Sequence, residues 1–176
     1  EGLVRLDSNL EPKEAMAEKI DISEDGLTYT FTLRDAQWTN GDPVTANDFV
    51  YGWLHMLNPE TASYSAFLAT GYIVGAQAYN DGSGDAAGVA IKAIDDKTFE
   101  VKLISPFDGF LAMITLPTFF PVNENVATAT PTWFANADTF VGNGPFKLTT
   151  WNHEEKMTFE KNDTYWDKDA VSLDRV

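Results

Sequence analysis

The most regular pattern in the chain is an alternation of apolar and polar side chains. From residue 27 to residue 33, large apolar side chains occupy every second position, and threonines occupy the positions between them. A period of two places all the apolar side chains on one face of an extended strand. Ile20 and Ile22 precede Asp25-Gly26, and an Asp-Gly pair between such segments is a strong hairpin signal. These residues predict a β-hairpin with one apolar face.

Two later segments repeat this layout. Residues 89–94 and 99–103 carry spaced apolar side chains on either side of Asp95-Asp96-Lys97. Residues 145–151 and 157–161 do the same around a polar turn. Each segment predicts another hairpin.

The two ends of the chain also read as strands. Residues 2–6 alternate apolar and charged side chains, and residues 171–176 have the composition of a strand that is beginning. The first residue is Glu1 rather than Met, and residues 1–20 contain no targeting segment. We therefore expect the natural protein to be longer than this chain.

A helical period follows the turn-forming sequence Asn40-Gly-Asp-Pro43. Thr45 and Asp48 have the spacing of a capping box, in which both side chains satisfy backbone N–H groups at the start of a helix. An apolar stripe follows, and Asn58-Pro59 ends it. The stripe consists of Phe49, Trp53 and Leu57, with Val50 and Leu54 widening it.

Shorter helices are predicted further along the chain. Residues 61–79 hold one or two helices with a break near Gly71, residues 107–114 hold another, and residues 123–137 are helical in parts. Residues 117–121 are expected to be extended. Hairpins interspersed with helices indicate an α+β or mixed α/β fold rather than a doubly wound parallel sheet.

Composition narrows the possible functions. The 176 residues carry 12 Lys+Arg against 27 Asp+Glu, for a formal net charge of −15. Such a charge repels nucleic acid and anionic membrane, so neither is an expected partner. The hydrophobic fraction of 44% is enough for a core, which excludes global disorder. No apolar run approaches the roughly 18–20 residues of a transmembrane helix.

Motifs for catalysis and metal binding are weak. Five tryptophans and abundant carboxylates leave a glycosidase as a remote alternative. His55 and His153 are far apart, and the chain has neither cysteine nor a Gly-x-Ser-x-Gly elbow. Asp81-x-Ser83-x-Asp85 resembles the opening of a calcium loop, but Ala86 and Lys92 replace its Gly and Glu. We expect no catalytic residue, metal or cofactor, and interpret both histidines as exposed.

The first hairpin and the segment after it are more specific. Ile22-Ser-Glu-Asp-Gly-Leu-Thr-Tyr-Thr-Phe-Thr-Leu-Arg34 is followed by Trp38-Thr-Asn-Gly-Asp-Pro-Val-Thr-Ala-Asn-Asp-Phe49. Together they closely resemble the signature of the extracytoplasmic solute-binding proteins of the peptide/nickel family, the receptors of ABC importers. We interpret the large side chains of this region, Tyr29, Phe31, Trp38, Phe49 and Trp53, as core residues.

The resemblance extends along the whole chain. Thr61-Ala-Ser-Tyr64 is similar to the Thr-Ala-Ser-Pro-Tyr segment of oligopeptide binders, without its proline. Other similar segments are Glu1-Gly-Leu3, Ala93–Val101, Gly142–Leu148, Asn162–Trp166 and Val171–Val176. The resemblance is therefore strongest to oligopeptide-binding proteins.

The resemblance implies a periplasmic-binding-protein-like receptor of class II, cluster C type, whose two lobes close on a ligand by a hinge motion. This chain would cover most of the first lobe. Residues 1–13 and 141–176 would belong to an incomplete central mixed sheet, and residues 14–140 to an inserted subdomain. The second lobe would lie outside this chain.

The same resemblance implies where a ligand binds. An extended peptide would be held by main-chain hydrogen bonds at strand edges, with its side chains in hydrated pockets. The implied contacts are Glu1, Gly2, Leu3, Tyr64, Asn143 and Gly144, with Phe67 as the alternative aromatic contact because the proline before Tyr64 is missing.

The expected function is therefore capture of oligopeptides for the permease subunits of a bacterial ABC importer. Receptors for dipeptides, nickel complexes or oligosaccharides on the same scaffold are the alternatives, because fold does not fix ligand. The expected location is extracytoplasmic, with a lipid anchor on a Gram-positive cell surface favoured over the periplasm. We expect the chain to be monomeric.

Overall fold

The computed structural model describes residues 1–176, and the chain divides into two compact units. Residues 1–34 and 45–122 form the first unit, and residues 35–44 and 123–176 form the second. Each unit is thus assembled from two separate stretches of chain. The assignment of residues to subdomains of a longer two-lobed receptor stays a prediction.

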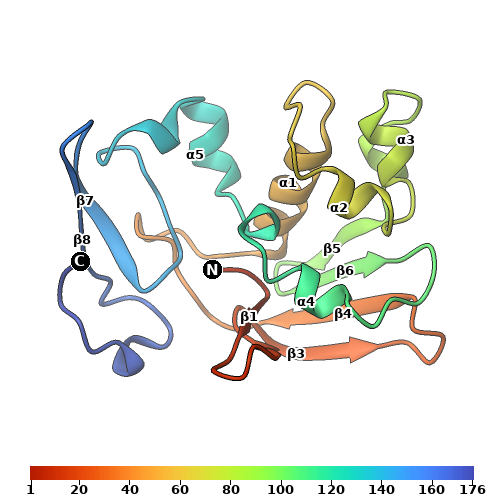
Figure 1. The fold of residues 1–176 in the computed structure, drawn as a ribbon, viewed down its shortest axis with the longest axis horizontal. Coiled ribbons are helices and arrows are strands. Elements are labelled where there is room, and N and C mark those ends of the chain that lie inside the picture. The colour runs from red at the N-terminus through yellow and green to blue at the C-terminus, as the bar shows by residue number, and fades with distance from the viewer. The chain divides into compact units, whose positions relative to one another are not determined.

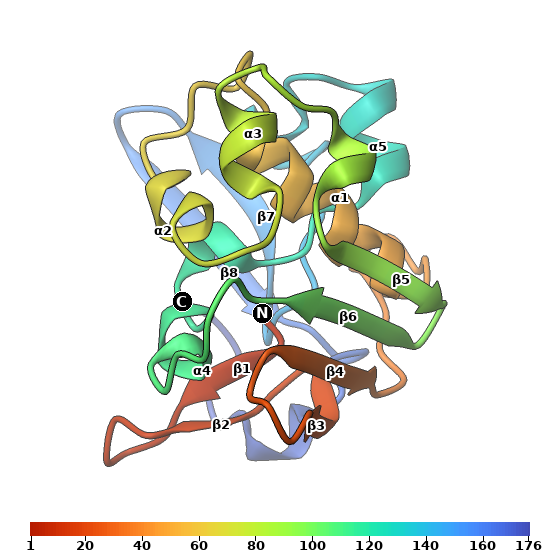
Figure 2. The same cartoon turned by 90° about the vertical axis from the view of Figure 1, so that its right-hand side faces the viewer.

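A four-stranded antiparallel sheet is the centre of the first unit. β3 (Ala17–Ile22) and β4 (Thr28–Leu33) form one hairpin, and β5 (Ile91–Asp95) and β6 (Thr98–Lys102) form another. The strand order β3-β4-β6-β5 joins the two hairpins through β4 and β6 (Figure 2). Both hairpins are confirmed, including the turn at Gly26, whose φ of +69° suits glycine.

The alternation along β4 produces the core face of this sheet. Tyr29, Phe31 and Leu33 are buried, and the threonines between them are half-buried on the opposite face. Phe31 stands opposite Phe99 of β6, and their rings lie 6.1 Å apart. Aromatic side chains paired across neighbouring strands therefore form part of the core of the first unit.

Helix α1 (Ala46–Leu57) covers this face (Figure 1). The predicted capping box is present, because the backbone N–H of Thr45 donates to the Asp48 carboxylate at 2.8 Å. The buried rings of Phe49 and Trp53 lie 5.8 Å and 5.0 Å from that of Phe99. All five large signature side chains are buried, which confirms their interpretation as core residues.

The stripe of α1 is wider on a different side from the prediction. Val50 and Leu54 are only half-buried, and Gly52 and Met56 are buried instead. A Cβ atom at position 52 would lie 2.8 Å from the carbonyl oxygen of Phe120, so glycine allows this close approach. The indole Nε1–H of Trp53 also donates to the carbonyl of residue 119 at 2.7 Å.

Two short helices confirm a broken helical stretch before the second hairpin. These are α2 (Phe67–Thr70) and α3 (Ala76–Asn80), on the same side of the sheet as α1 (Figures 1 and 2). Between them, Gly75 has a φ of +78°, and its Cα lies so close to Gly88 that a Cβ would stand 2.1 Å from the Gly88 carbonyl oxygen. A short 3₁₀ turn, η1 (Ala86–Gly88), precedes β5.

The segment after β6 departs from the prediction in two places. Helix α4 (Phe110–Met113) is shorter than the predicted span of 107–114. The prediction of an extended piece at residues 117–121 is wrong for its first half, which forms the 3₁₀ turn η2 (Pro117–Phe119). The fixed φ of proline suits the first position of a helical turn.

A small ribbon precedes the main sheet. β1 (Val4–Leu6) confirms the predicted first strand, whereas β2 (Pro12–Glu14) was not predicted. The three residues after β2, Ala15, Met16 and Ala17, are fully buried. A short apolar run between charged residues is the signal for this segment.

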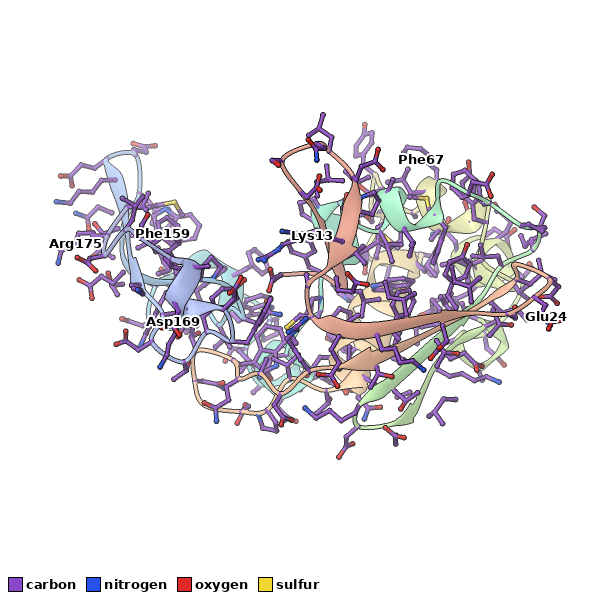
Figure 3. All side chains as sticks on the ribbon, turned by 90° about the horizontal axis from the view of Figure 1, so that it is seen from below. Lys13, Glu24, Phe67, Phe159, Asp169 and Arg175 are labelled. Carbon is purple, nitrogen blue, oxygen red and sulfur yellow. The ribbon has the colours of Figure 1, made fainter.

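The second unit is built on the third predicted hairpin, β7 (Phe146–Asn152) and β8 (Lys156–Lys161). The final residues pair with β8, where the N–H of Val176 donates to the carbonyl of Phe159 at 2.9 Å and the N–H of Phe159 donates to the carbonyl of Val176 at 2.8 Å. Figure 3 labels Phe159 and Arg175 in this region. Residues 171–176 form only an isolated bridge between Glu160 and Arg175 rather than a strand element, so the predicted last strand is confirmed only at its final residues.

Helix α5 (Glu124–Ala129) and the 3₁₀ turns η3 (Trp133–Ala135) and η4 (Lys168–Ala170) complete the second unit. Asn123 caps α5 by accepting from the backbone N–H of Val126 at 3.0 Å, and its amide donates to Asp42 at 3.1 Å. This residue therefore joins the two stretches of chain that form the unit. None of the helices in the structure has the length and apolarity needed to cross a bilayer.

Candidate functional site

Three groups of residues make up the predicted ligand site. Glu1–Leu3 and the aromatic residues Tyr64 and Phe67 belong to the first unit, and Asn143-Gly144 belongs to the second. Each group is described within its own unit.

The first group is fixed by backbone hydrogen bonds. The carbonyl of Gly2 accepts from the N–H of Met16 at 3.1 Å, and the carbonyl of Leu3 accepts from Ala15 and Ala17 at 3.0 Å. The Leu3 side chain is buried, so its side chain cannot contact a ligand. A contact of this residue would have to use the backbone.

At position 2, glycine lets the backbone lie close to an aromatic ring. A Cβ atom there would lie 2.9–3.0 Å from the ring of Phe120, which is tighter than ordinary van der Waals contact. Beside it, Glu1 Oε1 accepts from Arg5 Nη1 at 3.2 Å. Glu1 is thus one half of an ion pair at the start of β1.

The second group is the most exposed part of the predicted site. Tyr64 is 98% exposed and Phe67 69% exposed, although both are large aromatic side chains. Helix α2 has only four residues, of which Ala69 and Thr70 are buried. Figure 3 labels Phe67 on the first unit. Exposed aromatic rings are available to stack on a ligand.

A second aromatic pair, Tyr72 and Phe107, is packed ring against ring. The rings of Tyr72 and Phe107 stack at 4.4 Å with an interplanar angle of 20°. Nearby in sequence, Phe110 packs against Tyr29 at 4.6 Å. Burial, and secondarily the negative charge of Asp108, raise the pKa of the Tyr29 hydroxyl.

The third group lies on a loop that is held by the Asn162 turn. The Asn162 side chain donates to the carbonyl of Gly144 at 2.9 Å, and its backbone N–H donates to the carbonyl of Pro145 at 2.9 Å. Asn143 is 4% exposed, whereas a Cβ atom at Gly144 would meet nothing within 4 Å. The loop thus presents open space at Gly144.

The residues considered above for catalysis or metal binding are the two histidines and the loop at Asp81. His55 is exposed and its ring stacks on Tyr51 at 5.8 Å, and His153 is exposed and stacks on Trp151 at 4.7 Å. Both interpretations as exposed histidines are confirmed. The Asp81 carboxylate accepts from the hydroxyl and backbone N–H of Ser83. The structure brings together no three acidic or histidine side chains suited to a metal ion.

Comparison with known proteins identifies the family. Residues 11–176 match the family model of bacterial extracellular solute-binding proteins, family 5. The chain belongs to this family. Members of family 5 are solute-binding receptors rather than enzymes, and they act outside the cytoplasm.

Peptide-binding relatives of family 5 cover the whole chain. It is 56% identical to the dipeptide-binding protein DppE of Bacillus subtilis and 48% identical to the oligopeptide-binding protein OppA of that organism, over 100% of this chain and 32% of each relative. The chain therefore spans about a third of the length of these relatives. It is also 38% identical to a probable deoxycholate-binding periplasmic protein of Escherichia coli, again over 100% of this chain and 33% of the relative.

Solved structures of family 5 share this fold. The substrate-binding domain of an oligopeptide ABC transporter of Bacillus anthracis superposes with a TM-score of 0.96 at 45% identity, over 99% of this chain and 34% of that structure. Listeria monocytogenes OppA bound to peptide gives 0.94 at 41% identity, over 99% and 35%. The expected mixed fold of helices and antiparallel hairpins is confirmed.

Proposed function

We propose that this chain is part of the peptide-binding receptor of a bacterial ABC importer. The observation that carries the proposal is the match of residues 11–176 to family 5, together with whole-chain similarity to proteins named for dipeptide and oligopeptide binding. The receptor would enclose a peptide between two lobes and deliver it to the permease subunits. Such a receptor works outside the cytoplasm, and we propose a lipid-anchored, monomeric form on a Gram-positive cell surface.

The proposed contact residues are Glu1, Gly2, Leu3, Tyr64, Phe67, Asn143 and Gly144. Exposure supports a role for Tyr64 and Phe67, because side chains of 98% and 69% exposure have room for a partner. The buried side chain of Leu3 supports a contact through main-chain atoms only. This division suits a receptor that reads the peptide backbone and tolerates many side chains.

A calorimetric titration of the full-length receptor that contains this chain tests the function. Peptides of two to five residues, nickel chelates, oligosaccharides and deoxycholate are titrated in turn. We expect heat with peptides and none with the other classes. Binding of another class without any peptide binding would show that the receptor uses the same fold for a different ligand.

The same titration tests the aromatic contacts. Tyr64→Ala and Phe67→Ala remove exposed rings, so both variants are expected to keep the stability of the parent. The variant that loses a stacking contact should bind peptide about tenfold more weakly, for a loss of about 1.4 kcal/mol. Phe134→Ala is the matched control, because Phe134 is also exposed, at 56%, and is not a proposed contact.

A further inference from the structure

A hollow of about 420 Å³ opens on the second unit, and none of the proposed peptide contacts lines it. Its walls come from Thr39 and Asn40, from Ala137, Asp138, Phe140 and Val141, and from Lys147–Thr149 of β7. Neither Asn143 nor Gly144 lines it. Its volume lies within the range of about 300–1,000 Å³ that is usual for small-molecule sites.

Backbone pairing holds two walls of the hollow together. The N–H of Thr39 donates to the carbonyl of Gly142 at 2.8 Å, and the N–H of Gly142 donates to Thr39 Oγ1 at 3.1 Å. The two stretches of chain that build the second unit thus meet at this point. The hollow is consequently formed by the fold of the unit rather than by one loose loop.

One side of the hollow is apolar. Val141 and Leu148, which are 9% and 3% exposed, are among its lining residues. Phe140 adds an aromatic wall, and its ring is supported by Trp133 at a centroid distance of 5.7 Å. This side could cover an apolar group of about the size of a side chain.

Two opposite charges line the same hollow without a partner. Lys147 lies opposite Glu160 in the β7–β8 register, but the Glu160 carboxylate is taken by Arg175 at 2.8 Å. Neither the Lys147 ammonium nor the Asp138 carboxylate forms an ion pair or hydrogen bond within the chain. One hollow therefore offers a free cation and a free anion.

We propose that this hollow binds a small zwitterion with an apolar side chain, of the class of a free aromatic or aliphatic amino acid. The ligand ammonium would lie at Asp138, its carboxylate at Lys147, and its side chain against Phe140. Both protein charges are exposed, and exposed pairs are weak, so the expected dissociation constant is on the order of 1 mM.

NMR titration of the ¹⁵N-labelled full-length receptor that contains this chain with L-phenylalanine tests the proposal. We expect amide shifts centred on residues 39–40, 137–141 and 147–149. Asp138→Asn and Lys147→Gln should each weaken binding about threefold to tenfold, and Lys156→Gln, on the exposed start of β8, should leave it unchanged. The three positions are exposed, so all variants are expected to fold.

Two analogues assign each charge. Phenylalaninamide lacks the carboxylate, so Lys147→Gln should not weaken its binding further; N-acetylphenylalanine lacks the ammonium, so Asp138→Asn should not weaken its binding further. The proposal is overturned if shifts at the hollow are absent at 10-fold the expected dissociation constant, about 10 mM. It is also overturned if either analogue binds as well as phenylalanine, since the hollow would then recognise a single charge.

This result is independent of peptide binding. The hollow lies within one compact unit, and the titration uses no peptide. A second titration of the full-length receptor saturated with peptide should give the same shifts. Loss of the shifts only in that complex would assign phenylalanine to the peptide site and contradict a separate hollow.

Discussion

The two compact units differ in how much of their own surface they bury. In the first unit, β4 buries every second side chain and α1 buries seven of its twelve residues. In the second unit, neither β8 nor α5 contains a buried residue. The family signature therefore consists mainly of core residues of the first unit. The second unit is held together by backbone pairing and by side-chain hydrogen bonds such as those of Asn123 and Asn162. The residues that identify the family are accordingly not the residues expected to contact a ligand.

The largest difference is expected between two tryptophans. Trp53 is fully buried, donates to the carbonyl of residue 119, and meets Phe99 and Phe119 edge-on at 5.0 Å. Trp53→Ala should lower the free energy of unfolding by about 3–5 kcal/mol through the cavity that it leaves. Trp151→Ala in β7, where the half-buried ring stacks on a histidine, should lower it by about 1 kcal/mol. Urea denaturation followed by circular dichroism measures both, and equal losses would show that the units do not differ in packing.

A smaller contrast is expected between two glycines. Gly75→Ala forces a side chain into a φ of +78° and against the Gly88 carbonyl, so it should destabilise the first unit by about 1–3 kcal/mol. Gly144→Ala adds a methyl group to open space and should change stability by no more than about 0.5 kcal/mol.

The second substitution also probes the proposed peptide site. If the backbone of Gly144 approaches the ligand closely, Gly144→Ala will weaken peptide binding by the full-length receptor without unfolding it. Unchanged affinity would remove Gly144 from the proposed contacts.

The smallest expected effect is a response to acid. Hydrogen bonds lower the pKa of four exposed carboxyls of the first unit, Asp7, Asp25, Asp81 and Asp95. For Asp7, the main causes are the backbone N–H groups of Glu11 and Asn9. Because the folded pKa lies below the unfolded value of about 3.9, their contribution to stability is present above that pH and is lost as the pH falls through the folded pKa.

Amide-proton NMR shifts between pH 6 and pH 2.5 measure this response. The N–H groups of Glu11, Leu27, Ser83 and Lys97 donate to these four carboxylates and should move as each is protonated. In the second unit, the N–H of Val126 donates to Asn123, an amide that does not titrate, and should stay constant. A shift of Val126 as large as that of Glu11 would mean that acid loosens the whole chain rather than these turns.

Local chemistry made most of the elements predictable. The hairpins follow from alternation and from turns such as Asp25-Gly26, and the start of α1 follows from Thr45 and Asp48. These signals act within a few residues, so the sequence carries them directly. The pairing of β4 with β6 was not predicted, because it joins segments that are far apart in the sequence.

The errors have the same origin. Gly52 is buried because the backbone of Phe120, far away in the sequence, lies against it. Val50 and Leu54 are half-buried, so the apolar stripe of a helix does not by itself predict which side of the helix is covered. The peptide contacts came from resemblance and stay predictions. The sequence did not predict the hollow at Asp138 and Lys147. Lys147 is unpaired there because Glu160, which faces it across the hairpin, pairs with Arg175.

The strand order also has a consequence for synthesis on the ribosome. The β3–β4 hairpin can form as soon as residue 33 has emerged, but the other edge of β4 must wait for residues 98–102. At about 5–20 residues per second, that edge and the aromatic face behind it stay uncovered for several seconds. Nascent chains that contain β4 but not yet β6 are thus the species that holding chaperones would have to bind.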